Sequence, residues 1–303
     1  MKILVTGASG LLGSNVVTQA LRRNHSVVGL SNSHVLAPRE GLEVVNVDLS
    51  EISSLDRLLL DHWPDVIVNA AAISQPDIVA KEPELAEHMN VAMPLRVAQL
   101  AHHIGALCVH ISTDMVFDGK NQEPYQTTDL PEPSSTYGKQ KLQSEREVLE
   151  HCTDRPIVLR IPILMGNGMQ QNRSVHEKLL AMIAAGKRPS LFTNEIRQPA
   201  SATNIAELIV ELAERGNLTG IFHWAGVDTL SRADIGAAIL DKFGLDTDLI
   251  DRVECTDPER PLSLKLNARP LLGKVRTQPW TIQSQLRELS VPDSIYPWYE
   301  SQF

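Results

Sequence analysis

Cysteine, positive charge and long apolar runs are all scarce in this chain of 303 residues. Its three cysteines, Cys108, Cys152 and Cys255, are far apart and odd in number, which excludes a disulfide scaffold and fits free thiols in a reducing compartment. No run approaches the roughly 20 apolar residues that span a bilayer, and the first residues lack the layout of a signal peptide. Lys and Arg number 28 against 37 Asp and Glu, and the net charge of −9 repels phosphate backbones. We therefore expect a soluble, cytoplasmic protein that binds neither a membrane nor nucleic acid.

Metal-binding spacings and low-complexity segments are also missing. The ten histidines form no H-x-x-x-H pattern and the cysteines form no C-x-x-C pair, so we expect no catalytic metal. Hydrophobic residues make up 43% of the chain, which excludes intrinsic disorder. That fraction is ample for the core of one large domain or two modest ones.

Short apolar runs alternate with helical stretches through the first half of the chain. Six runs predict strands: Lys2–Val5, Ser26–Leu30, Glu43–Val47, Val66–Val68, Leu107–Ile111 and Ile157–Arg160. Apolar residues at helical spacing between them predict helices over Leu11–Arg22, Ile52–Asp61, Pro83–Ile104 and Ser135–His151. Strands that alternate with such helices form βαβ units with right-handed crossovers, and unbroken apolar runs fit strands buried on both faces. We therefore expect an α/β fold with a Rossmann-type, doubly wound parallel sheet.

The alternation loosens after about Pro162. The later part predicts helices and one clear strand, over Val175–Ala185, Asn204–Arg215, Arg232–Phe243 and Ile221–His223. Many prolines lie among them. We expect a sheet domain over residues 1–165 and a smaller mixed lobe over residues 166–303, with some later segments returning to the first domain.

Three glycines follow the first predicted strand, in the segment Gly7-Ala-Ser9-Gly10-Leu11-Leu12-Gly13. Gly7 permits a tight turn, Gly10 lets backbone N–H groups approach a pyrophosphate, and Gly13 lets the helix pack closely on the strand. The helix N-terminus adds partial positive charge for the phosphates. The spacing differs from the G-x-G-x-x-G of many dehydrogenases, and three glycines can also mark a simple turn. Their place after a strand favours a dinucleotide cofactor, with these candidate contacts: Gly7, Ser9, Gly10, Leu11, Leu12 and Gly13.

The residues that end the second and third predicted strands bear on which nicotinamide cofactor fits. An acid at the end of the second strand would bind the adenosine ribose of NAD and repel the 2′-phosphate of NADP. Here Ser31-Asn-Ser33 stands in that place and the first acid is Glu40, which favours NADPH while NADH stays open. The same residues also suit a plain loop. Asp48, followed by Leu49 after the third strand, can accept the adenine amino group or cap the next helix.

Small side chains follow the fourth predicted strand as Ala70-Ala71-Ala72. Three methyl groups in a row leave the backbone open to the flat surface of a cofactor, although close packing alone explains them as well. All three are candidate cofactor contacts.

A hydroxyl, a phenol and an amine have the spacing of a proton-transfer set. Tyr137 and Lys141 lie four residues apart in a predicted helix and so share one face. A tyrosine is a weak acid at neutral pH unless a cation stabilises its phenolate, and Lys141 is the candidate cation, which also suits the nicotinamide ribose. Thr113 ends a strand at the carboxyl edge of the sheet, where open α/β folds bind ligands. Together the three predict hydride addition to a ketone, with Tyr137 as proton donor.

These motifs, in this order and spacing, resemble those of the extended short-chain dehydrogenases/reductases. The resemblance rests on Gly7–Gly13, Asn69-Ala-Ala-Ala72, Ser112-Thr113-Asp114 and Tyr137-x-x-x-Lys141. Within that family, Ile111–Gly119 and Ser135–Lys141 resemble the dTDP-4-dehydrorhamnose reductases, which reduce the 4-keto group of a deoxysugar nucleotide with NAD(P)H. The resemblance implies that residues 1–165 bind NAD(P) and that residues 166–303 mainly bind the substrate. It also adds these cofactor contacts: Asn90, Ser112, Pro162 and Ile163.

A second resemblance competes inside the same family. The stretches Gln75–Val79, Val158–Leu164 and Gly220–Gly226 look like the regulatory β subunits of methionine adenosyltransferase, which keep the reductase fold and bind NADP but act as partners of another enzyme. Those subunits also have a Tyr and a Lys of this kind, so the motif alone does not decide between turnover and regulation. A sugar-nucleotide epimerase or dehydratase is a third reading, although the Asp-Glu pair of dehydratases is missing after Thr113.

By this resemblance, Thr113, Asp114 and Met115 contact the sugar of the substrate. Met115 replaces the tyrosine of the usual Ser-Thr-Asp-Tyr-Val-Phe pattern, which removes a hydrogen-bonding group and leaves the identity of the sugar open. Arg197 is the candidate for the nucleotide diphosphate, because a guanidinium fits phosphate with two hydrogen bonds; its alternative is a surface arginine. The extended family often forms dimers, so a homodimer is implied as well.

Overall fold

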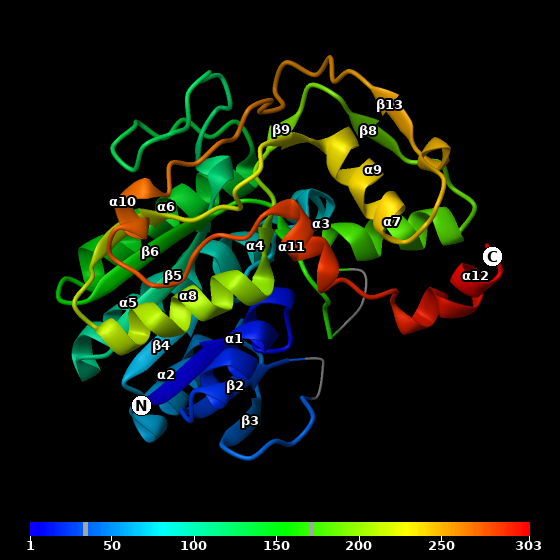
Figure 1. Ribbon diagram of the computed structural model, residues 1–303. Coiled ribbons are helices and arrows are strands. Elements are labelled where there is room, and N and C mark those ends of the chain that lie inside the picture. The colour runs from blue at the N-terminus through cyan, green and yellow to red at the C-terminus, as the bar shows by residue number, and fades with distance from the viewer. Residues whose placement is uncertain (33–35, 170–172) are drawn as a thin grey trace.

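The computed structural model describes residues 1–32, 36–169 and 173–303, and in this part of the chain a seven-stranded sheet forms the centre (Figure 1). All neighbouring strands in it are parallel. Its order is β3 (Leu42–Asn46), β2 (Ser26–Ser31), β1 (Lys2–Thr6), β4 (Val66–Asn69), β5 (Leu107–Thr113), β6 (Pro156–Ile161) and β11 (Gly220–His223). The expected parallel α/β sheet is confirmed.

Helices cover both faces of the sheet, because its strands carry apolar side chains on both sides. In β1, Ile3 and Val5 point into one core, whereas Leu4 between them points into the other. The first core lies under α1 (Leu11–Arg22) and α8 (Ala202–Arg215), which lie side by side (Figure 1). The second lies under α2 (Ile52–His62), α5 (Met93–Ile104) and α6 (Thr136–His151).

The strand order reverses between β1 and β4. The chain runs outward from β1 to β3 and then returns to β4 on the other side of β1. Thr6 at the end of β1 is the strand partner of Asn69 at the end of β4, so the loops that follow them, Gly7 onward and Ala70 onward, begin side by side. Doubly wound sheets bind ligands outside the carboxyl ends of the strands at such a switch point.

One expected helix, Pro83–Ile104, is divided in the structure. It consists of α4 (Pro83–Glu87), a π-helical turn η1 (His88–Ala92) and α5. Pro94 has no N–H for the carbonyl of Asn90, and a widened turn ahead of it accommodates that missing hydrogen bond. Such turns are frequent at functional sites. The other expected strands and helices agree with the structure to within about two residues at each end.

The later part of the chain contributes to two different cores. Its α8 and β11 join the central sheet and its layers. A separate core lies under α7 (Val175–Ala184), α9 (Arg232–Lys242), α11 (Ile282–Arg287) and α12 (Tyr296–Glu300). Three small two-stranded sheets accompany it: β7 (Leu164–Met165) with β10 (Ala200–Ser201), β9 (Ile196–Arg197) with β12 (Leu230–Ser231), and β8 (Ser190–Phe192) with β13 (Asp251–Val253). The short elements α3 (Pro76–Lys81), η2 (Asp114–Val116), η3 (Thr247–Leu249), α10 (Arg269–Leu272) and η4 (Asp293–Ile295) complete the fold. Among the described residues, no helix is long and apolar enough to cross a membrane.

A buried carboxylate fixes the segment after α10 to α8. Glu211 of α8 accepts backbone N–H groups from Arg276 at 2.7 Å and Thr277 at 2.8 Å, and it also accepts the Thr277 hydroxyl. Arg215, one turn further along α8, donates to it as well. Burial raises the pKa of Glu211, but these hydrogen bonds outweigh burial and hold that pKa at about 2.

The variant Glu211→Gln should lower the free energy of unfolding by about 2 kcal/mol at pH 7, since hydrogen bonds to a charged group are worth about 1.5–3 kcal/mol. The depressed pKa stabilises the fold above the ordinary carboxyl pKa of 4.5, and this contribution is lost as the pH falls toward 2. The difference between wild type and variant should therefore shrink over that range. Urea unfolding at several pH values measures it.

Glu214→Gln on the same helix is the matched control. Glu214 pairs with Arg23 and His25 at the surface, where an ion pair contributes only about 0–1 kcal/mol. Equal losses in the two variants, or a loss that does not depend on pH, would contradict the role given to Glu211.

Candidate functional site

The glycine turn joins β1, α1 and the loop after β4 by contacts that leave no room for side chains. Gly7 has a φ of 64°, and a Cβ there would lie 2.9 Å from the Cα of Ala71. A Cβ on Gly13 would lie 2.1 Å from the carbonyl oxygen of Gly7. Among the described residues, a Cβ on Gly10 would have only that same oxygen within 4 Å, at 3.1 Å, so the space beside Gly10 is otherwise open.

This open side has the properties of a phosphate cradle. Gly10 caps α1, and the first turn of α1 contains no acid, so the partial positive charge of the helix end is not offset there. Ser9, Leu11 and Leu12 are all buried. Because the side chains of Leu11 and Leu12 are buried, a ligand at the turn can meet only the backbone of these two residues.

The end of β2 contains a buried hydroxyl. Ser31 is 4% exposed, and its Oγ has no hydrogen-bond partner among the residues that the structure describes. Ser33 lies outside the described residues. After β3, Asp48 is exposed and accepts the backbone N–H of Ser50 at 2.9 Å, which lowers the pKa of Asp48, while Leu49 is buried. Asp48 thus forms a turn at the edge where its adenine contact was expected.

The loop after β4 is fixed at both ends. The N–H of Ala71 donates to the Thr6 hydroxyl at 3.1 Å, and Ala70, Ala71 and Ala72 keep part of their surface accessible. At the far end, Asn90 in the π-helical turn bonds both the N–H and the carbonyl of Ile73, each at 2.9 Å. Asn90 also donates to the Gln140 side chain of α6 at 2.8 Å. The amide of Asn90 therefore braces the loop against α6, and its expected contact with a cofactor stays a prediction.

Helix α6 begins very close to the turn that follows β5. Ser135 caps the helix by accepting the N–H of Gly138 at 3.0 Å. A Cβ on Gly138 would lie 2.3 Å from the carbonyl oxygen of Met115, so only glycine permits this approach. Sequence reasoning had not singled out Gly138, although its place directly after Tyr137 is a visible signal. The approach brings Tyr137 to the turn that contains Thr113 and Asp114.

Asp114 is buried, and its carboxyl interacts electrostatically with Arg197 and with Tyr137. Its Oδ1 accepts the Thr113 hydroxyl at 3.2 Å, and its Oδ2 has no partner among the described residues. Burial raises the pKa of Asp114 to about 6, against the opposing charge of Arg197. Burial and the Asp114 carboxyl together raise the pKa of Tyr137 above its ordinary value. The half-buried Met115 completes this turn, as expected from its place in the sequence.

The sequence predicts that Lys141 lowers the pKa of Tyr137. In the structure that pKa is raised instead, by burial and by Asp114. Lys141 is 2% exposed and its Nζ lies 3.0 Å from Nε2 of His110 in β5. Burial lowers the pKa of Lys141 to about 7, opposed by Glu145. Lys141 therefore points into the sheet, and the raised pKa of Tyr137 keeps its phenol protonated at neutral pH.

Next along α6, Glu145 and Arg160 of β6 form a buried ion pair. Arg160 donates through Nε and Nη2, with a shortest distance of 2.7 Å, and both side chains are 2% exposed. The Ser112 hydroxyl also donates to Glu145. The sequence predicts a cofactor contact for Ser112, but in the structure its hydroxyl binds the Glu145 carboxylate of this ion pair. Beyond β6, the buried Pro162 and half-buried Ile163 follow the strand as expected, and the Ile163 carbonyl accepts the N–H of Ala200.

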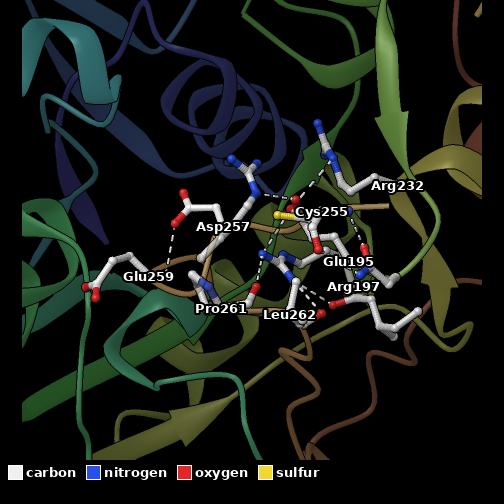
Figure 2. A network of polar contacts seen from close by, with 11 residues as sticks. Glu195, Arg197, Arg232, Cys255, Asp257, Glu259, Pro261 and Leu262 are labelled. Atoms are coloured by element: carbon white, nitrogen blue, oxygen red, sulfur yellow. Dashed lines mark hydrogen bonds and ion pairs between the residues drawn. The ribbon is translucent and has the colours of Figure 1, made fainter. Parts of the chain in front are cut away.

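Arg197 is held by protein groups. It pairs with the buried Glu195 at 2.9 Å and donates to the carbonyls of Pro261 and Leu262 (Figure 2). The alternative interpretation, a surface arginine, does not fit, because Arg197 is buried. Most hydrogen-bond donors of its guanidinium bind groups of the protein itself. Two more arginines surround Glu195: Arg260 at 2.5 Å and Arg232 at 4.0 Å.

The cluster of Glu195 with Arg197, Arg232 and Arg260 has three positive charges for one negative charge. Nη1 of Arg232 is buried and has no partner in the part of the chain that the structure describes. Arg232 was missed by sequence reasoning, because a single arginine at the start of a helix gives no signal of its own.

Comparison with known proteins fits this geometry. A family model described as RmlD substrate binding domain matches residues 1–289. The chain belongs to this family. Methionine adenosyltransferase 2 subunit beta of Xenopus laevis is 32% identical over 249 residues, which are 80% of this chain and 72% of that protein. The probable low-salt glycan biosynthesis reductase Agl14 of Haloferax volcanii is 30% identical over 302 residues, with 98% of this chain and 99% of that protein covered.

Solved structures show the same fold. A hypothetical dTDP-4-dehydrorhamnose reductase from Sulfolobus tokodaii has a TM-score of 0.80 and 29% identity, covering 96% of this chain and 100% of that one. A dTDP-4-dehydrorhamnose reductase from Bacillus anthracis, crystallised with NADP, has a TM-score of 0.80 and 21% identity, covering 95% and 96%. Both resemblances read from the sequence are therefore confirmed at the level of the RmlD family.

The close approach of α6 to η2 predicts the effect of a single methyl group. Gly138→Ala should lower the free energy of unfolding by about 1–3 kcal/mol, because the new Cβ overlaps the Met115 carbonyl and must push α6 away. Gly273→Ala is the control, since nothing lies within 4 Å of a Cβ there and its φ of −69° suits alanine. Thermal unfolding measures both. A Gly138→Ala protein as stable as Gly273→Ala would show that the approach is looser than described.

Proposed function

We propose that this RmlD family member reduces the 4-keto group of a deoxysugar nucleotide with NAD(P)H. The observation that supports the proposal is the close approach of α6, which contains Tyr137 and Lys141, to the turn that contains Thr113 and Asp114 at the carboxyl edge of the sheet. The α6 contact at Gly138 brings the start of this helix to that turn, and the Asp114 charge acts on Tyr137. The reductases among the relatives support the same reaction class.

The residues fit a nicotinamide dinucleotide. The open side of Gly10 at the N-terminus of α1 suits its pyrophosphate, and the small residues after β4 leave a path for its length. The buried, unpartnered Ser31 hydroxyl supports NADPH, since no acid is present there to repel a 2′-phosphate. NADH remains the second choice.

In the proposed reaction the cofactor supplies a hydride to C4 of the sugar. Tyr137 donates the proton to the ketone oxygen. Its raised pKa keeps the phenol protonated at neutral pH but makes it a weaker acid, so a positive charge near the phenol has to develop before the proton is transferred. Thr113 hydrogen-bonds the carbonyl, and Lys141, the expected contact of the nicotinamide ribose, has to leave His110 to reach it. Asp114 and Met115 border the sugar, and Arg197 lies close enough to Asp114 for its charge to act on it.

The nucleotide diphosphate is assigned to the arginine side of the site. Arg197 is the residue expected from the sequence, and the unpartnered Nη1 of Arg232 adds a donor beside it. A dTDP sugar is the first substrate to test. A homodimer and a cytoplasmic location stay predictions of the sequence.

Tyr137→Phe should reduce the rate of NADPH oxidation by at least about 100-fold, because it removes the proton donor and little else. The assay follows reduced-nicotinamide absorbance with NADPH and then NADH, against freshly generated dTDP-4-keto-6-deoxy-L-mannose. NADPH binding, measured by fluorescence, should stay within a few-fold of wild type. Tyr296→Phe is the matched control, since that phenol is 48% exposed on the far lobe. Turnover by Tyr137→Phe at the wild-type rate would refute the proposed mechanism.

A regulatory role is the second candidate. The similarity to methionine adenosyltransferase 2 subunit beta over most of the chain favours it. It predicts that the protein binds NADPH, oxidises none with any keto sugar, and co-purifies with an added methionine adenosyltransferase catalytic chain. Turnover of the keto sugar without such a partner would decide for the reductase.

A further inference from the structure

A chain of buried polar groups leads from the cofactor loop to Lys141. The Ala71 N–H donates to Thr6 Oγ1 at 3.1 Å, and Thr6 Oγ1 donates to Asn69 Oδ1 at 2.8 Å. Nδ2 of Asn69 lies 3.1 Å from Nδ1 of His110, whose Nε2 lies 3.0 Å from Nζ of Lys141. The side chains in this series of hydrogen bonds are those of Thr6, Asn69, His110 and Lys141. Each is at most 2% exposed, so water has little access to their hydrogen bonds.

The first end of this chain determines which ring nitrogen of His110 bears the proton. Thr6 Oγ1 receives the Ala71 N–H, so its own proton is left for Asn69 Oδ1. The amide of Asn69 then faces Nδ1 of His110 with an N–H. Nδ1 must accept, and in a neutral ring the proton is on Nε2.

The other end requires the same tautomer. Ser144, three residues beyond Lys141, donates its only hydroxyl proton to the Lys141 carbonyl at 2.8 Å. Its oxygen, 3.0 Å from Nε2 of His110, can therefore only accept from that nitrogen. Burial holds the pKa of His110 well below its usual range, so the ring is neutral.

Lys141 thus meets a donor. The one Nε2–H proton lies between two acceptors at 3.0 Å, Ser144 Oγ and the lone pair of a neutral Lys141 amine, whereas an ammonium at that place would set N–H against N–H. Among the described residues, Nζ has no other hydrogen-bond partner. The charges that bear on this pair come from Glu145 on α6, which favours the ammonium but is itself neutralised by Arg160 of β6. The partners from β1 and β4, Thr6 and Asn69, are uncharged.

We propose that His110 is a positioning residue that is locked by Thr6 and Asn69 in its Nε2–H tautomer and thereby holds Lys141 as an uncharged amine in the free protein. The link to Ala71 connects this state to the loop assigned to the cofactor. The significance of the Lys141 charge for catalysis rests on the proposed reductase function, but the tautomer itself does not.

The test is ¹⁵N NMR of the intact protein labelled in its histidine rings, where protonated and unprotonated nitrogens have separate shifts. The variant His110→Gln identifies the His110 signals among the ten histidines. At pH 8 the wild type should show Nε2–H and a bare Nδ1. A ring with Nδ1–H would overturn the proposal, whatever the variants below do.

The pH dependence gives the second readout. As the pH falls through about 7, Lys141 gains its proton and the His110 shifts should change with the same midpoint, while in Lys141→Met this change should be absent. Thr6→Val removes one of the two groups that fix the tautomer and lets Asn69 turn its amide. When the Ser144 hydroxyl turns with it, the ring can offer Nε2 as an acceptor to the ammonium. The midpoint should then rise by about one pH unit.

Thr6→Ser keeps the hydroxyl and is the matched control, so its midpoint should equal that of wild type. Equal midpoints in Thr6→Val and Thr6→Ser would also overturn the proposal, because the hydroxyl would then have no influence on Lys141. No substrate is needed for any of these spectra. A failed reductase assay therefore leaves the tautomer result intact, and an Nδ1–H ring leaves the reductase assignment intact.

Discussion

The buried ion pair of Glu145 with Arg160 determines where α6 lies on the sheet, and the site depends on that position. The two side chains are 2% exposed and meet through several hydrogen bonds, and the Arg160 guanidinium also lies 5.1 Å from the ring centre of Phe117. Removing one partner of such a pair typically costs about 3–5 kcal/mol, because the other charge stays buried and unpaired. With Glu145 fixed in this way, Lys141 and Tyr137, one and two turns earlier on α6, are directed to β5 and to the turn after it.

The face of α6 toward the sheet is unusually polar for a helix in this position. Tyr137, Lys141 and Glu145 follow one another at four-residue intervals on it, where the opposite layer uses apolar side chains such as Leu208 and Ile209 of α8. Lys141 and Glu145, the two that are fully buried, each require a partner in the sheet, since an unsatisfied buried polar group is costly. His110 and Arg160 supply those partners from neighbouring strands. The register of α6 is therefore specified by hydrogen bonds and charge as well as by packing.

The sequence alone predicted those features whose signal is local. The glycine turn, the six first strands and the spacing of Tyr137 and Lys141 are each visible within a few residues. The π-helical turn at Asn90 was not predicted, because it depends on Pro94 and on a contact with Ile73 in another segment. The neighbours that contact Lys141 or affect its pKa were not predicted for the same reason. His110 and Glu145 come within reach of it only when β5 and α6 are placed side by side, and the expected effect of Lys141 on Tyr137 took no account of burial.

The most direct test of the account follows the hydride itself. The protein would be incubated with NADPH bearing deuterium at the transferable position of C4, together with dTDP-4-keto-6-deoxy-L-mannose, and the sugar product examined by NMR. One deuterium at C4 of the sugar and none elsewhere is expected if Tyr137 and Thr113 act on the 4-keto group as proposed. A product without deuterium, or no product although NADPH binds, would contradict the account.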